Sequence, residues 1–129
     1  MGAMAIILLV DDDPLQAFVR KSILERRFPD VKRVGDAAEA LRLVEQPQFA
    51  GSLALVVSGH SRTGIGGPAF VAELHTRLPK LPVLVLDDPS TDHGAYPGDR
   101  VRFLSRPIKP EEMLAVAGQM MAQSERKTA

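Results

Sequence analysis

Cysteine is absent from this chain of 129 residues, and its absence excludes several kinds of site at once. There is no disulfide, no thiolate metal site and no cysteine nucleophile. No apolar run approaches the roughly 20 residues that a membrane span requires. The 16 basic and 16 acidic side chains cancel, so the overall charge does not favour binding to nucleic acid or to an anionic membrane.

The N-terminus lacks a charged segment followed by an apolar one, so we expect no signal peptide and a protein of the cytoplasm. Met1-Gly2-Ala3 ahead of Met4 resembles an expression-vector remnant. We therefore predict a remnant over residues 1–4, one domain over 5–123, and a polar tail or linker stump over 124–129. A hydrophobic content of 45% with 25% charged residues is typical of a globular domain.

Short apolar segments alternate along the chain with segments of helical periodicity. Five strands are predicted, over Ile6–Val10, Val31–Val34, Leu53–Val57, Val83–Leu86 and Val101–Ser105. Strands that are apolar throughout need helices on both faces of their sheet. Because crossovers between parallel strands are right-handed, the pattern predicts an α/β fold with a doubly wound, five-stranded parallel sheet.

The helical segments are less uniform than the strands. An amphipathic helix is predicted over about Pro14–Arg27, because six residues share one helical face: Leu15, Phe18, Val19, Ser22, Ile23 and Arg26. Asp36 begins the next helix and Pro47 closes it, and a third helix runs from Pro68 to Leu78. The last begins at Pro110, with core packing favoured over a binding face for its methionines.

Three carboxylates follow the first strand directly, as Asp11, Asp12 and Asp13. Asp13 before Pro14 is typical of a helix N-cap. In open α/β sheets ligands bind at this carboxyl edge, and Mg²⁺ between adjacent carboxylates would relieve their repulsion. The alternative is that Asp11 and Asp12 are simply hydrated.

Three segments in this order and spacing resemble the response-regulator receiver (CheY-like) domain of bacterial two-component signalling. They are Leu8-Leu9-Val10-Asp11-Asp12-Asp13-Pro14, Leu81-Pro82-Val83-Leu84-Val85-Leu86 and Phe103-Leu104-Ser105-Arg106-Pro107. The resemblance covers Ala5 to about Gln123. It implies a flavodoxin-like sheet in the order 2-1-3-4-5, and an aspartate that accepts a phosphoryl group from a histidine kinase.

The resemblance places a glycine where the family has its nucleophile. That aspartate lies eight residues before the glycine that opens the third helix, and counting back from Gly67 gives Gly59. Glycine can neither attack phosphorus nor bind a metal. The neighbours Ser58 and Ser61 have no evident base beside them, and His60 is expected to be an ordinary loop residue.

The other positions implied by the resemblance have changed as well, except for the acid pair Asp11 and Asp12. Asp87 stands where the family has Thr or Ser, and a carboxylate there would repel a phosphoryl group. Phe103 matches the aromatic switch, and Arg106 replaces the lysine before Pro107, whose preceding peptide bond is expected to be cis.

These changes predict a degenerate receiver that is not an enzyme, with weak Mg²⁺ binding or none at Asp11 and Asp12. We expect Arg106 to bridge Asp87 or Asp12 in place of the metal. The sequence between Asp87 and Arg100 predicts that the fourth family helix is short or missing.

A phosphorylation-independent interaction module follows from this interpretation. Its partners would be a histidine kinase, an output domain or another signalling protein, and a homodimer is left open. One alternative is phosphorylation by a histidine kinase at a non-standard residue. Another is a pocket for a small cationic or neutral ligand among Asp11, Asp12, Asp87 and Asp88. A haloacid-dehalogenase-type phosphatase site is disfavoured, because Leu15 stands where that pattern has Thr or Val.

Overall fold

The computed structural model describes residues 5–59, 67–87, 93–96 and 100–128. The strands are β1 (Ile6–Val10), β2 (Val31–Val34), β3 (Leu53–Gly59), β4 (Val83–Asp87) and β5 (Val101–Ser105). The helices are α1 (Pro14–Leu24), α2 (Ala37–Val44), α3 (Pro47–Ser52), α4 (Gly67–Arg77) and α5 (Pro110–Thr128), with a 3₁₀ turn η1 (His93–Ala95). Within the described parts, no helix is long and apolar enough to cross a membrane.

The five strands form one parallel sheet in the order β2-β1-β3-β4-β5, which confirms the predicted fold class. β1 and β3 lie at its centre, with Val10 paired to Ser58 near their carboxyl ends. All strands run the same way, so their carboxyl ends share one edge of the sheet. The carboxylates after β1 and the end of β3 are therefore neighbours.

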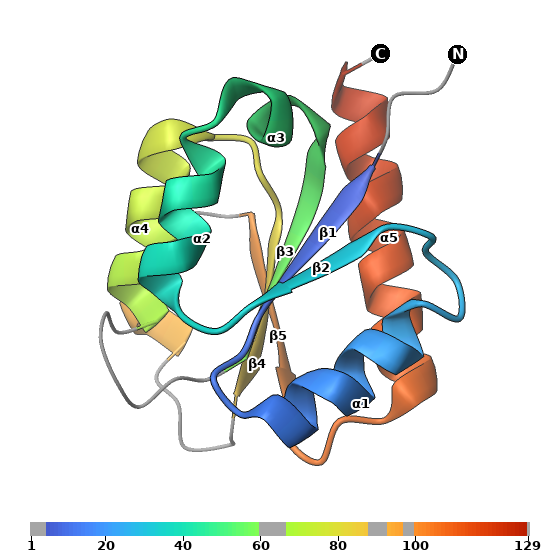
Figure 1. Cartoon of the computed structure of the whole chain (residues 1–129). Helices are drawn as coiled ribbons and strands as arrows, with labels where there is room; N and C mark the ends of the chain where they lie inside the picture. Colours follow the sequence, from blue (N-terminus) through green and yellow to red (C-terminus); the bar gives the residue numbers. More distant parts are fainter. Residues whose placement is uncertain (1–4, 60–66, 88–92, 97–99, 129) are drawn as a thin grey trace.

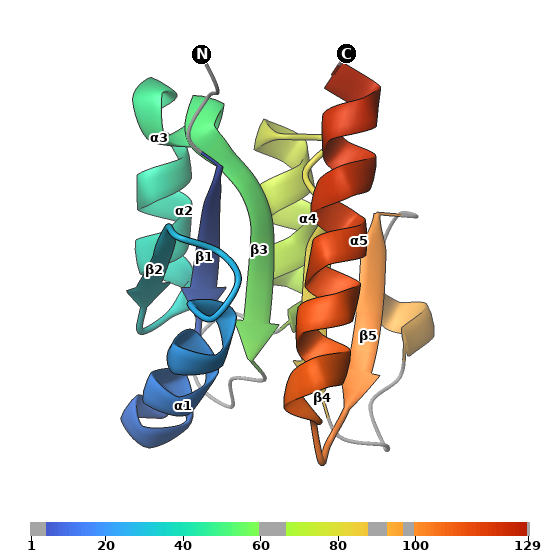
Figure 2. The same cartoon turned by 90° about the vertical axis from the view of Figure 1, so that its right-hand side faces the viewer.

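Helices cover both faces of the sheet, with α1 and α5 on one face and α2 and α4 on the other (Figures 1 and 2). Alternate residues of β1 pack into the two resulting cores. Ile7 and Leu9 join the side chains of α1 and α5, whereas Leu8 and Val10 join those of α2 and α4. This division explains why the strand is apolar at every position.

The predicted apolar stripe of α1 is not the face that the helix buries, and this expectation was wrong. Leu15, Phe18 and Val19 are 74%, 72% and 48% exposed. The buried residues of the helix are Ala17, Arg20 and Leu24. The helix is oriented so that Arg20 faces the sheet, where its side chain forms an ion pair with Asp11.

Several helix boundaries differ from the prediction, among them the end of α1 at Leu24 in place of about Arg27, and the helix α3 was not expected. Pro47 does follow the end of α2, but it also begins α3, because proline at the first helical position loses no hydrogen bond there. α5 continues to Thr128, so the predicted polar tail is helical over residues 124–128. The expected core role of the methionines is confirmed, since Met113 and Met120 are buried.

Between β4 and β5 the described residues contain only η1, a single 3₁₀ turn. Residues 88–92 and 97–99 of this connection lie outside the described residues, as do His60 and Ser61. Within the part of the connection that is described, the fourth family helix is replaced by this short turn, as the prolines and glycines of the segment predict.

A candidate site at the carboxyl edge of the sheet

Asp11 is the buried centre of the site, with a relative exposure of 2%. Its Oδ1 accepts a hydrogen bond from the backbone N–H of Asp13 at 3.0 Å, and its Oδ2 accepts one from Nη1 of Arg20 at 2.7 Å. Its backbone carbonyl accepts from Nε and Nη2 of Arg33 at 3.2 and 2.8 Å. Asp11 is thus held by hydrogen bonds at both carboxylate oxygens and at its carbonyl.

Arg20 reaches Asp11 from the second turn of α1. The two side chains are 10% and 3% exposed, so the ion pair is almost completely removed from water. Such a pair gains more Coulomb attraction than a surface pair, but it must also offset the loss of hydration of both charges. The contact gives α1 a reason to bury Arg20 and leave Phe18 in solvent.

Gly59 ends β3 directly beside this ion pair. A Cβ atom built on Gly59 would lie 3.0 Å from Nη1 of Arg20 and 3.0 Å from both Cγ and Oδ2 of Asp11. The guanidinium therefore lies over the position from which a side chain at residue 59 would project. No carboxylate occurs anywhere in the sequence between Leu53 and Glu73, so neither β3 nor the segment after it contains an acid.

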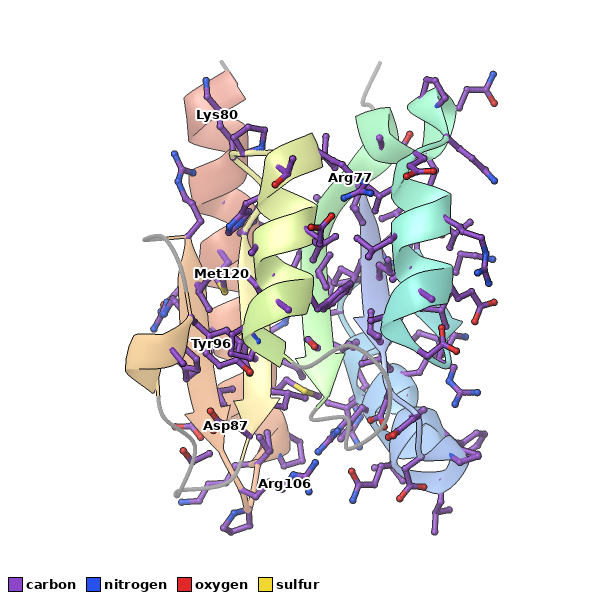
Figure 3. The ribbon with its side chains drawn as sticks, turned by 90° about the vertical axis from the view of Figure 1, so that its left-hand side faces the viewer. Arg77, Lys80, Asp87, Tyr96, Arg106 and Met120 are labelled. Carbon is purple, nitrogen blue, oxygen red and sulfur yellow. The ribbon has the colours of Figure 1, made fainter. Side chains whose placement is uncertain are left out.

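Asp87 ends β4 and is completely buried. Its Oδ1 accepts a hydrogen bond from Oγ of Ser105 at 3.3 Å, and its carbonyl accepts one from the backbone N–H of Arg106 at 2.8 Å. Figure 3 shows Asp87 and Arg106 at the same end of the sheet, with Lys80 at the opposite end. The structure therefore brings these two predicted site residues to one edge.

The peptide bond between Arg106 and Pro107 is cis, as the resemblance implies. The expected bridge from Arg106 to Asp87 or Asp12 is wrong, because the ion pairs between described residues do not include Arg106. Its Nε is buried and has no hydrogen-bond partner. Arg20 pairs with the first carboxylate instead, because a helix residue facing the sheet can reach Asp11.

Phe103 of β5 packs against an aromatic residue that the sequence reasoning did not single out. The ring of Tyr96 meets the ring of Phe103 edge to face, with centroids 5.2 Å apart and planes at 76°. The Tyr96 hydroxyl also lies so close to Gly67 that a Cβ there would collide with it. Burial raises the pKa of Tyr96, and the negative charge of Asp87 raises this pKa further.

Three carboxylates and three guanidinium groups gather at this edge, counting Arg33 beside the residues predicted from the sequence. They belong to Asp11, Asp12, Asp87, Arg20, Arg33 and Arg106. Asp12 is exposed, whereas Asp11 and Asp87 are buried. Among the described residues, no three His, Asp or Glu side chains lie close enough together to hold a metal ion.

Arg20 was missed because the apolar stripe of Leu15, Phe18 and Val19 suggested a different buried face. A signal was nevertheless present in the sequence. Arg20 stands three residues after Ala17 and four before Leu24, on a helical face that is otherwise apolar. An arginine in that setting is a candidate for a buried ion pair with a carboxylate on the sheet.

No family model matches the chain, and no curated protein matches it. Several solved structures match the chain in fold. A receiver domain of the hybrid histidine kinase CckA has a TM-score of 0.73 and 26% identity, and the alignment covers 90% of this chain and 98% of that one. A receiver domain protein (CheY-like) from Methanospirillum hungatei JF-1 gives a TM-score of 0.81 at 19% identity, covering 96% and 98%.

A third structure is the signal receiver domain of an HD domain-containing protein from Pseudomonas fluorescens Pf-5. It has a TM-score of 0.80 at 22% identity over 99% of this chain and 94% of that one. The chain has the receiver fold. Its polar edge therefore lies at the end of the receiver sheet where the carboxylates after β1 and the ends of β3 and β4 meet.

Proposed function

We propose that this receiver-fold chain is a signalling module that works without phosphoryl transfer, through contacts with other proteins. The observation that carries the proposal is the Arg20 guanidinium above Gly59, paired with Asp11 at 2.7 Å. In this position it supplies a fixed positive charge to the carboxylate. Because this charge belongs to the protein, the Asp11 carboxylate is neutralised without a bound metal ion or other ligand.

Phosphoryl transfer needs a nucleophile, and the described residues at this edge offer none that is activated. Gly59 takes the place that the resemblance assigns to the phosphoacceptor, and it has no side chain. The hydroxyl of Ser58 is buried and donates to the carbonyl of Gly59 at 3.4 Å. Without a base beside it, a serine hydroxyl is a weak nucleophile.

The residues present do not fit the Mg²⁺ ion of phosphorylated receivers. Mg²⁺ requires near-octahedral coordination by oxygen ligands. Gly59 provides no ligand, and both carboxylate oxygens of Asp11 accept hydrogen bonds from Arg20 and from the Asp13 backbone. A cation placed at Asp11 would also meet the guanidinium of Arg20 at close range, and the two positive charges would repel each other.

A phosphatase activity of the haloacid-dehalogenase type has equally little support. That chemistry needs two free carboxylates, and Asp11 and Asp13 would have to provide them. The Oδ1 of Asp13 caps α1 by accepting from the backbone N–H groups of Leu15 and Gln16. We therefore infer a non-enzymatic module.

The partner class is proposed from the titles of the structural neighbours. One neighbour is a receiver domain of a hybrid histidine kinase, and another is a response regulator/GGDEF domain protein that this chain covers over 51% of its length. A histidine kinase, an output domain or another signalling protein is accordingly the kind of partner proposed here.

The test is incubation with a labelled small phosphodonor and Mg²⁺, followed by intact-protein mass spectrometry and label counting at acidic and alkaline pH. We expect no covalent adduct on this chain, whereas a phosphorylatable receiver in a parallel reaction is labelled. An adduct mapped to Ser58, His60 or Ser61 would overturn the proposal and favour phosphorylation at a non-standard residue.

Calorimetric titration with Mg²⁺ supplies the matched control. The parent chain is expected to bind no Mg²⁺ at micromolar affinity. The double variant Arg20→Ala with Gly59→Asp removes the guanidinium and supplies a third carboxylate, and it is expected to bind Mg²⁺ more tightly than the parent does. Tight binding by the parent would contradict the proposed role of Arg20.

A further inference from the structure

The exposed face of α1 is more apolar than a solvated helix face needs to be. Leu15, Phe18 and Val19 are 74%, 72% and 48% exposed and adjoin one another at helical spacing. They are the large hydrophobic residues that the described surface exposes most. Single exposed apolar residues are common, but a contiguous group of three on one helix is typical of an interaction surface.

A groove of about 390 Å³ lies beside these residues, between α1 and the connection from β5 to α5. Its apolar walls are formed by Leu15, Val19, Ile23, Pro107, Ile108 and Met113. Arg20 and Arg106 also line it, and the Nε of Arg106 is buried without a hydrogen-bond partner. Leu15 and Val19 belong both to the exposed apolar group and to the wall of this groove, so the groove continues the apolar surface of α1.

The two ends of α1 carry charges of opposite sign. The exposed residues Asp12 and Asp13 are at the amino end, and the exposed residues Arg26 and Arg27 follow the carboxyl end. Lys21 and Glu25 pair with each other at 2.9 Å. A second α1 helix placed antiparallel would put its acidic end opposite the basic end of the first.

We propose that α1 is a self-association surface, on which two copies of this chain pair across a two-fold axis near Phe18 and Val19. The Leu15, Phe18 and Val19 side chains of the two copies pack against each other, and the acidic and basic helix ends face each other twice. A two-fold interface requires one patch to be complementary to itself, and the apolar group with opposite charges at its two ends meets this requirement.

The size of the surface sets the strength of the pairing. α1 has 11 residues and is about 16 Å long. Two such helices with their grooves form an interface at or below the low end of specific complexes, about 1,200 Å² in total, so a weak dimer is expected. The formal net charge of zero adds no overall repulsion between copies. This inference does not depend on whether the pocket takes a phosphoryl group.

The test is analytical ultracentrifugation of the full chain from about 5 to 500 µM, the range in which a micromolar dimer dissociates. We expect a reversible monomer–dimer equilibrium that weakens at high salt. Phe18→Glu should raise the dissociation constant by at least about tenfold, and Arg26→Glu with Arg27→Glu by roughly as much. The matched controls are Ala38→Glu on α2, and Arg42→Glu with Lys80→Glu, all at exposed positions outside α1 and the elements it packs against.

The lack of cysteine permits a second, geometric test. A single Val19→Cys variant places its thiol near the proposed axis, so mild oxidation should give a disulfide-linked dimer. Ala38→Cys should give none above background. A chain that stays monomeric at every concentration, or a dimer unaffected by Phe18→Glu, would overturn the proposal. In the first case the α1 surface would be assigned to a different protein partner or to a small amphipathic anion.

Discussion

The Nη1 of Arg20 lies 2.7 Å from the Oδ2 of Asp11, and both side chains are almost fully buried. This pair joins the middle of α1 to the carboxyl end of β1. It determines which face of α1 meets the sheet, occupies the space above Gly59, and leaves Leu15 and Phe18 in solvent. One ion pair therefore accounts for two features: the guanidinium occupies the space that a side chain at residue 59 would need, and the apolar surface of α1 is left exposed.

Replacing Arg20 with alanine is expected to lower the free energy of unfolding by about 3 kcal/mol, because Asp11 would remain buried without its partner. Denaturant unfolding of parent and variant measures the difference. Lys21→Ala is the matched control on the same helix. It breaks the exposed pair with Glu25, and its cost should stay below about 0.5 kcal/mol. Equal losses of unfolding free energy in the two variants would contradict a larger contribution from the buried pair than from the exposed one.

Gly59→Ala should destabilise the chain by about 1–3 kcal/mol, the usual cost of overpacking a filled space. The new Cβ would lie 3.0 Å from Arg20 and Asp11, and the backbone of Gly59 is not left-handed, so the cost comes from the neighbours alone. The same change made in an Arg20→Ala background should cost less. Gly51→Ala is the control, since a Cβ at Gly51 has nothing within 4 Å.

Gly67→Ala is expected to be destabilising because its Cβ would collide with the hydroxyl of Tyr96. Tyr96→Phe removes that hydroxyl and should rescue part of the loss. Thermal or denaturant unfolding of the two single variants and the double variant gives the coupling between the positions. In contrast, Gly118→Ala within α5 should stabilise by about 0.5–1 kcal/mol, because its Cβ would make only an ordinary contact with Phe28.

Tyr96 should make stability fall in the alkaline range. Its pKa is raised in the folded state by burial and by Asp87, above an ordinary value of about 10. The unfolded chain therefore loses this proton first as pH rises, so the contribution of Tyr96 is complete below about pH 10 and is lost through the folded pKa. Tyr96→Phe should remove this component of the pH dependence.

An absorbance titration of the tyrosinate checks the shift directly, because the chain has one tyrosine and no tryptophan. The folded protein should titrate at higher pH than the denatured protein. Coincident titration curves would contradict the burial of the Tyr96 hydroxyl.

The sequence by itself determined the five strands, most of the helices and the α/β fold class. The central strands β1, β3 and β4 are almost wholly apolar because they are buried on both faces, and this pattern can be recognised without knowledge of the tertiary contacts. The cis bond before Pro107 was predicted from the resemblance to receiver domains, and the structure contains it. The assignment of Gly59 to the phosphoacceptor position followed from the resemblance, by counting eight residues back from Gly67, although the strand was predicted to end at Val57 and extends to Gly59.

Only the tertiary structure decided which side chains meet at the edge of the sheet. Helical periodicity indicates that a helix has two faces, but the apolar stripe containing Phe18 was the wrong choice for the buried face. The ion pair between Arg20 and Asp11, nine residues apart, depends on how α1 is oriented against β1. The contacts of Arg33 with the Asp11 carbonyl and of Tyr96 with Phe103 likewise join separate elements. Such contacts arise from packing in three dimensions, which no local pattern of residues contains.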